Sequence, residues 1–137
     1  MGLKILGTGS ALPSNMVTNE QLTKMVDTSD EWIASRTGIR QRHISTGETT
    51  TELCVRAARR ALENAGMQAE ELELIVVATL SGDRALPNTG CEVQRELNAV
   101  HATAFEINAA CSGFLFALNT VQAYMAAGLY RKALVIG

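Results

Sequence analysis

Residues 105–118 have the sequence FEINAACSGFLFAL, in which two apolar segments are joined by small residues. The first segment ends at Ile107, and the hinge Asn108-Ala109-Ala110 leads into Cys111 and a second apolar run. This pattern predicts a buried strand, a tight turn and a helix that begins close to Cys111. The stretch therefore favours an α/β fold, and it raises the question of whether Cys111 is a packing residue or a nucleophile.

Strand-like and helix-like segments alternate along the rest of the chain. We expect strands at 3–6, 72–80, 102–108 and 131–137, and helices at 50–65, 88–97 and 111–127. Two short helices are expected earlier, where Thr18 pairs with Gln21 and Thr28 pairs with Glu31 as capping boxes. Thr49 with Glu52 is likewise expected to cap the start of the helix at 50–65. Residues 38–45 are expected to be an exposed connection. This alternation is typical of a mostly parallel, buried sheet with helices on both faces.

The composition excludes several classes of protein. Hydrophobic residues make up 47% of the chain and the formal net charge is −2, so no basic nucleic-acid surface is expected. The nearly apolar segment 113–129 contains Asn119 and Gln122, which favours a core helix over a membrane span. No signal peptide is visible, and three widely spaced cysteines fit a reducing cytoplasm without a zinc site. Residues 7–13, GTGSALP, lack the third glycine of a dinucleotide loop and predict a simple turn.

Cys111 is the candidate nucleophile. A cysteine in the first turn of a helix lies near unpaired backbone N–H groups and the positive end of the helix dipole, which stabilise a thiolate. The same N–H groups can donate to a developing oxyanion. The residues alone leave the alternative open, because many lone cysteines are buried and unreactive. Cys54 and Cys91 are expected to be structural, and neither His43 nor His101 is expected to act as a base for Cys111.

Three motifs resemble β-ketoacyl-acyl-carrier-protein synthase III, a condensing-enzyme family of the thiolase superfamily. They are TSDEWIASRTGIRQRHI at 28–44, LIVVATLSGDRALPNTGCEVQREL at 74–97 and EINAACSGFLFAL at 106–118. The resemblance extends in order over the whole chain. It implies that residues 1–137 form the amino-terminal half-domain of a thiolase-like αβαβα layered fold, with the carboxy-terminal half absent from this chain.

The resemblance implies an acyltransferase that initiates fatty-acid synthesis. Cys111 would take an acyl group, usually acetyl, from acyl-coenzyme A and condense it, with decarboxylation, onto malonyl-acyl carrier protein. Thr28, Trp32 and Arg36 would bind coenzyme A, because an indole stacks on adenine and a guanidinium pairs with phosphate. Leu86 would reach across a homodimer interface into the acyl pocket, where a Phe is common. The resemblance also implies a cytoplasmic enzyme without a metal or other cofactor, for which acyl-coenzyme A is a substrate.

Two alternatives remain at this stage. One is a ketosynthase III-like enzyme of secondary metabolism that uses an unusual starter or acceptor. The other is a non-catalytic, dimer-forming fragment in which the cysteine is structural.

The family's second half supplies a His and an Asn that promote decarboxylation, and we expect this chain to be a fragment without them. We predict that the purified chain alone forms no 3-ketoacyl product from acetyl-coenzyme A and malonyl-acyl carrier protein. A product assay on the chain by itself tests this expectation, and detection of the ketoacyl product would show it to be wrong.

Overall fold

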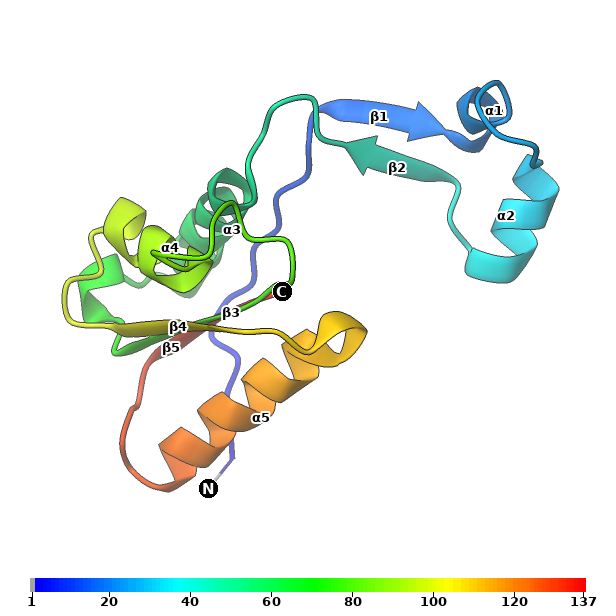
Figure 1. The fold of residues 1–137 in the computed structure, drawn as a ribbon. Coiled ribbons are helices and arrows are strands. Elements are labelled where there is room, and N and C mark those ends of the chain that lie inside the picture. Colours follow the sequence, from blue (N-terminus) through cyan, green and yellow to red (C-terminus); the bar gives the residue numbers. More distant parts are fainter. Residues whose placement is uncertain (1) are drawn as a thin grey trace. The chain divides into compact units, whose positions relative to one another are not determined.

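The computed structural model describes residues 2–137, which form two compact units. One unit contains the described residues up to Ala11 together with Thr49–Gly137, and the other is Leu12–Glu48. The larger unit carries a parallel sheet with helices, and the smaller one carries a separate β-hairpin with two helices (Figure 1).

The sheet of the larger unit has three parallel strands in the order β4–β3–β5. Their bounds are Leu74–Ala78 for β3, Thr103–Ile107 for β4 and Ala133–Ile136 for β5. In the central strand, Leu74 lies opposite Thr103 on one side and Ala133 on the other. The three strands predicted from 72 onward are confirmed, and each is one or two residues shorter at either end than predicted.

Helices cover both faces of this sheet. The helices α3, Thr50–Ala65, and α4, Thr89–Leu97, lie over one face, and α5, Gly113–Ala126, lies over the other (Figure 1). A short 3-10 turn at Ala69–Glu71 leads from α3 into the sheet. The predicted α/β class, with a parallel sheet between helices, is therefore confirmed.

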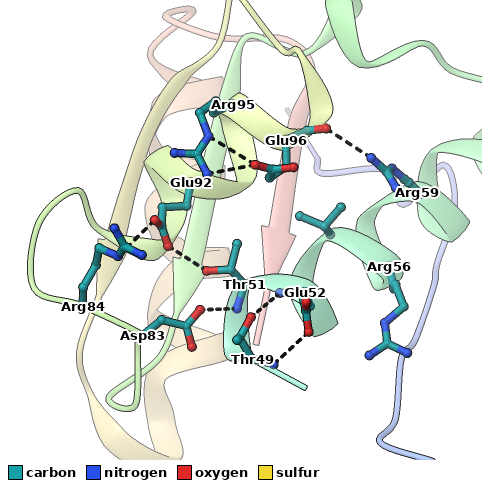
Figure 2. Close-up of a pocket in the computed structure, with 11 residues that line it drawn as sticks. Thr49, Thr51, Glu52, Arg56, Arg59, Asp83, Arg84, Glu92, Arg95 and Glu96 are labelled. Atoms are coloured by element: carbon teal, nitrogen blue, oxygen red, sulfur yellow. Dashed lines mark hydrogen bonds and ion pairs between the residues drawn. The ribbon is translucent and has the colours of Figure 1, made fainter. Parts of the chain in front are cut away.

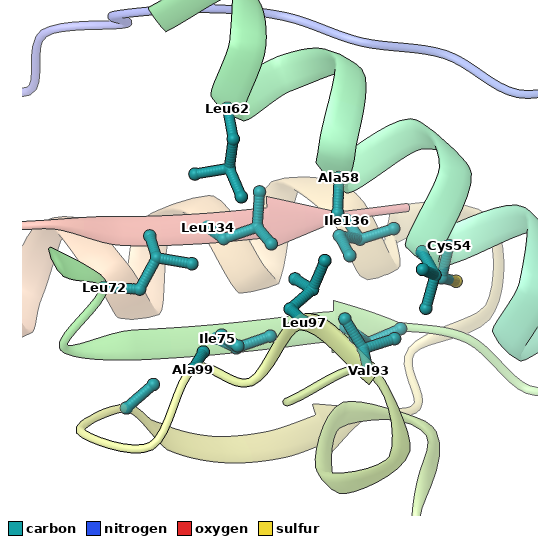
Figure 3. Close-up of a cluster of buried hydrophobic side chains, with 13 residues drawn as sticks. Cys54, Ala58, Leu62, Leu72, Ile75, Val93, Leu97, Ala99, Leu134 and Ile136 are labelled. Carbon is teal, nitrogen blue, oxygen red and sulfur yellow. The ribbon is translucent and has the colours of Figure 1, made fainter. Parts of the chain in front are cut away.

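The alternation of side chains along β3 explains the two helical layers. Ile75 points into the core beneath α3 and α4 (Figure 3), and Val77 belongs to the same cluster of buried side chains. Leu74 and Val76 pack against α5 on the other face. All four side chains are at most 1% exposed. Removing such side chains from water contributes roughly 1.5–3 kcal/mol each, so β3 makes a large contribution to the hydrophobic stabilisation of this unit.

The apolar character of α5 extends beyond the side that packs on the sheet. Ala117 and Val121 are buried against β3, but Leu115 and Phe116 are 63% and 57% exposed. Among the described residues, no helix is both long enough and apolar enough to cross a bilayer.

The predicted strand at residues 3–6 is wrong, and so is the predicted turn at 7–13. Residues 2–13 have no regular secondary structure, because no strand of the unit pairs with them. The segment instead passes close to α3, where a Cβ atom on Gly7 would lie 2.6 Å from backbone atoms of Ala61 and Ala65. Glycine is required there for close packing against a helix and not for binding a phosphate.

The smaller unit is a pair of antiparallel strands with two short helices in the connection between them. Its elements are β1 (Asn15–Thr18), α1 (Asn19–Leu22), α2 (Asp30–Thr37) and β2 (Gln41–Ile44). Asn15 pairs with Ile44 and Thr18 with Gln41. The prediction of an exposed connection at 38–45 is therefore wrong for 41–44. These residues form a strand, which their polar side chains did not indicate, because the partner strand lies far away in the sequence.

The helix ends test the predicted capping signals. The capping boxes of Thr18 with Gln21 and of Thr49 with Glu52 are confirmed at the starts of α1 and α3. The box predicted at Thr28 is wrong, because the Ser29 hydroxyl accepts the Trp32 N–H at 3.1 Å and starts α2 one residue later.

Glu48 ties together the two ends of the smaller unit. Its carboxylate accepts the backbone N–H of Ser14 and that of Thr46, each at 3.0 Å. The hydrogen bond from Ser14, followed by that from Thr46, lowers the pKa of Glu48 from its usual 4.5 to about 2. These bonds therefore favour the charged carboxylate in the folded unit.

We predict that Glu48→Gln makes this unit less stable at neutral pH and less sensitive to acid. Because the pKa of Glu48 is lowered in the folded state, its stabilisation is present above pH 4.5 and is lost as the pH falls toward 2. Thermal unfolding followed by the fluorescence of Trp32, the one tryptophan of the chain, measures this difference. The control is Glu20→Gln in α1, and a melting-temperature gap for Glu48→Gln that stays constant down to pH 2 would contradict the prediction.

Candidate active site

Cys111 lies at the carboxyl edge of the parallel sheet, in the turn that joins β4 to α5 (Figure 1). The turn is a short 3-10 segment, Ala110–Ser112, in which the Ser112 N–H donates to the Ala109 carbonyl at 3.1 Å. Cys111 was expected in the first turn of the α-helix, but α5 begins two residues later at Gly113. The thiol thus lies in the 3-10 turn that immediately precedes a 14-residue helix.

The backbone on either side of Cys111 is tightly constrained. Ala110 has φ +45°, a left-handed conformation that non-glycine residues rarely adopt and that costs about 1–3 kcal/mol. Gly113 is buried against the end of β3, where an added Cβ would lie 3.2 Å from the Cβ of Ala78. The Cys111 side chain is exposed. Strained backbone of this kind is found most often at functional sites.

The other two cysteines occupy the packing positions predicted for them. Cys54 is buried on α3, where burial, followed by the negative charge of Asp83, raises the pKa of its thiol to about 11. Cys91 is half-buried on α4, with its Sγ 3.7 Å from the Ala104 carbonyl oxygen. Cys111 is the one exposed thiol among the three.

Neither histidine of the chain is placed as a base for Cys111 by a described contact. His101 lies in the turn that precedes β4, at the amino edge of the sheet, whereas Cys111 lies at the carboxyl edge. His43 belongs to the smaller unit, and its Nδ1 lies 2.7 Å from the Pro13 carbonyl oxygen.

The predicted coenzyme A residues lie in the smaller unit. Trp32 and Arg36 are exposed on one face of α2, one helical turn apart, and the Arg36 Cζ lies 4.6 Å from the centre of the indole ring. Thr28 is half-buried just before the residue that caps α2. The helix thus presents a flat aromatic ring and a cation side by side, which can stack on a base and attract a phosphate.

Sequence patterns did not indicate the buried residue that holds α2 in place. The Asn19 side chain is 1% exposed, and its Nδ2 donates to Asp30 Oδ1 and to the Ile39 carbonyl, both at 2.8 Å. Its Oδ1 accepts from Arg42 of β2 at 3.3 Å. Asn19 thereby connects both ends of α2 to the hairpin, through partners that lie 11 to 23 residues away.

Leu86 lies on the loop between β3 and α4 and is 84% exposed. This loop leaves the carboxyl end of β3, and Cys111 follows the carboxyl end of the neighbouring β4. Because the strands are parallel, the two segments belong to the same edge of the sheet, where open α/β sheets usually bind ligands.

A polar groove of about 670 Å³ lies beside this loop, between α3 and α4 (Figure 2). Four arginines and four carboxylates contribute to its walls, among them Asp83, Arg84 and Glu92. None of the predicted site residues lines it. The polar residues of the segment 81–84 were the one feature of the sequence that pointed to this groove. They did not indicate which residues of α3 and α4 would form its other walls.

Comparison with known proteins identifies a consistent set of relatives. The family described as 3-oxoacyl-[acyl-carrier-protein (ACP)] synthase III matches residues 105–137. The β-ketoacyl-[acyl-carrier-protein] synthase III of Clostridium acetobutylicum is 50% identical over 135 residues, which cover 98% of this chain and 42% of that protein. The synthase III of Aquifex aeolicus is 49% identical over 137 residues, which cover all of this chain and 44% of that protein.

Solved structures share the fold. The crystal structure of 3-oxoacyl-[acyl-carrier-protein] synthase III from Aquifex aeolicus is 48% identical with a TM-score of 0.94, over 98% of this chain and 44% of that one. The priming β-ketosynthase of the R1128 polyketide pathway is 38% identical with a TM-score of 0.91, over 96% and 40%. These matches confirm the predicted fold class and resemblance, and the chain spans about two fifths of the length of the relatives it matches.

Proposed function

We propose that this chain, which matches the amino-terminal part of the β-ketoacyl-acyl-carrier-protein synthases III, carries the nucleophile of the acyltransferase that initiates fatty-acid synthesis. The observation that supports this most directly is the exposed Cys111 on a strained turn between β4 and α5. A relative named β-ketoacyl-[acyl-carrier-protein] synthase III is 50% identical to this chain over 98% of its length. Because the Cys111 thiol is exposed, a substrate carbonyl can approach it.

In the proposed first step, the Cys111 thiolate attacks the carbonyl carbon of an acyl-coenzyme A thioester. The carbon–sulfur bond to coenzyme A then breaks, and coenzyme A leaves as a thiolate that takes up a proton. Backbone N–H groups of the turn around Cys111 would stabilise the developing oxyanion. The cysteine keeps the acyl group as a new thioester.

In the proposed second step, malonyl-acyl carrier protein loses carbon dioxide. The resulting carbanion attacks the acyl group on Cys111, which frees the thiol and forms a 3-ketoacyl carrier protein. The resemblance assigns the decarboxylation to a His and an Asn of the family's second half, so the residues described here would serve mainly the first step.

We also propose the remaining partners and setting. Acyl-coenzyme A is a substrate and not a resident cofactor, and no metal is required for the thioester exchange. Malonyl-acyl carrier protein is the acceptor, and the enzyme works in the cytoplasm as a homodimer. Leu86 would enter the acyl pocket of the partner subunit.

For coenzyme A, we propose that Trp32 stacks on the adenine and that Arg36 binds a phosphate. Thr28 would line the entrance of the same binding site. The exposed indole and the neighbouring guanidinium support this role. The hydrogen bonds of Asn19 would keep α2, and with it both side chains, in place before the ligand arrives.

We predict that Trp32→Ala weakens coenzyme A binding about tenfold, because it removes the stacking surface for the base. Isothermal titration of the full-length protein with coenzyme A measures the change in Kd. Trp32→Phe is the matched control and should keep most of the affinity, since it retains an aromatic face. Equal affinity in Trp32→Ala and the unmodified protein would rule out the stacking role.

We predict that Cys111→Ala abolishes acylation of the full-length protein by acyl-coenzyme A. Intact-mass spectrometry should show one added acetyl group in the unmodified protein and none in Cys111→Ala. Cys91→Ala is the control and should still be acylated, because Cys91 is a half-buried packing residue of α4. Full activity in Cys111→Ala would instead show that Cys111 is a structural residue and not the acyl acceptor.

A ketosynthase of secondary metabolism is the second candidate function. It is supported by the 38% identity to a priming β-ketosynthase of a polyketide pathway. Incubating the full-length protein with several acyl-coenzyme A thioesters separates the two functions by the acyl group that Cys111 retains.

A further inference from the structure

We propose that Asp83 is a positioning residue that anchors the loop between β3 and α4 to the amino terminus of α3, and that this anchor sets which acyl groups the enzyme accepts. The inference rests on the proposed function, because it takes Leu86 as part of an acyl pocket. The contacts between Asp83 and the start of α3 do not depend on the proposed function.

The two oxygens of the Asp83 carboxylate bind two consecutive amides at the start of α3. Oδ1 accepts the Thr50 N–H at 2.9 Å. Oδ2 accepts the Thr51 N–H at 2.8 Å, the bond that Figure 2 shows. These amides belong to the first turn of a 16-residue helix, where the helix dipole favours a negative charge. Hydrogen bonds to a charged acceptor are stronger than neutral ones.

A second contact fastens the same loop to α3. The Thr50 hydroxyl donates to the Ser81 carbonyl at 2.8 Å. Burial opposes ionisation of Asp83, but the hydrogen bonds from Thr51 and Thr50 outweigh it and lower the pKa of Asp83. The carboxylate is therefore charged at neutral pH, as the contact with two N–H donors requires.

The loop is also held against α4. Arg84 pairs with Glu92 at 3.3 Å, and the buried Glu92 carboxylate accepts the Thr51 hydroxyl at 2.9 Å (Figure 2). An added Cβ on Gly82 would lie 2.7 Å from the Oγ1 of Thr89, in the first turn of α4. The segment just before Asp83 therefore has no space in which to shift toward α4.

These contacts end at Arg84, two residues before Leu86, which is 84% exposed. Because the Leu86 side chain is mostly in solvent, its position depends on the anchored residues before it and on α4 after it. A leucine presented in this way sets the size of a neighbouring pocket only if its backbone is fixed. Asp83 supplies two charged hydrogen bonds that help to fix it.

The test uses the full-length protein with Asp83→Ala, Asp83→Asn and the control Glu52→Ala. Glu52 accepts the Thr49 N–H at the same helix terminus but does not contact the loop. Hydrogen–deuterium exchange of the peptide covering 80–88 reports the anchor, and kcat/KM for acetyl-, butyryl- and isobutyryl-coenzyme A reports acyl selectivity.

We expect exchange in the loop to become about tenfold faster in Asp83→Ala, because a charged double hydrogen bond is lost. The ratio of kcat/KM between the best and the poorest substrate should fall by about threefold or more, since a mobile Leu86 discriminates less. Asp83→Asn keeps the shape and should lie between, and it replaces Asp83→Ala if that variant does not fold. Glu52→Ala should leave both loop exchange and selectivity unchanged.

Unchanged loop exchange in both Asp83 variants would overturn the anchor. Faster exchange with unchanged selectivity would overturn the specificity role. If the unmodified protein accepts no acyl group on Cys111, the proposed function fails instead, and the exchange result still decides whether Asp83 anchors the loop.

Discussion

The pairing of β3 with parallel strands on both sides is the constraint on which the larger unit depends. Because β3 is hydrogen-bonded on both edges and covered on both faces, its side chains must be apolar throughout, and Leu74, Ile75, Val76 and Val77 satisfy this requirement. The parallel direction also brings the carboxyl ends of β3 and β4 to one edge. The Leu86 loop and the Cys111 turn lie at that edge for this reason.

Close backbone contacts shape that edge further. Gly113 packs against Ala78, and Gly82 packs against Thr89, so closely that a Cβ atom on either glycine would force its neighbour to shift. Ala110 adopts a left-handed conformation before Cys111. The chemistry proposed for the exposed thiol therefore rests on a backbone that the buried strands hold in one conformation, and not on the cysteine alone.

Ionised side chains have a different role in this chain from apolar ones. Asp83 and Glu48 each join segments that are distant in the sequence, by accepting backbone N–H groups at helix or loop ends. Both carboxylates keep lowered pKa values through these bonds. Hydrophobic burial holds the sheet and helices together, whereas these two charged carboxylates hold loop segments in place.

The sequence by itself determined the parts of this protein that depend on neighbouring residues. Apolar periodicity located β3 and α3, the capping boxes at Thr18 and Thr49 located helix starts, and the motif around Cys111 indicated both the α/β class and the resemblance. The tertiary structure alone decided the parts that depend on distant partners. Residues 41–44 are a strand because they pair with β1, whereas 3–6 are not because no strand of the unit pairs with them. The Asp83 anchor likewise joins residues more than 30 positions apart, and local patterns carry no information about such contacts.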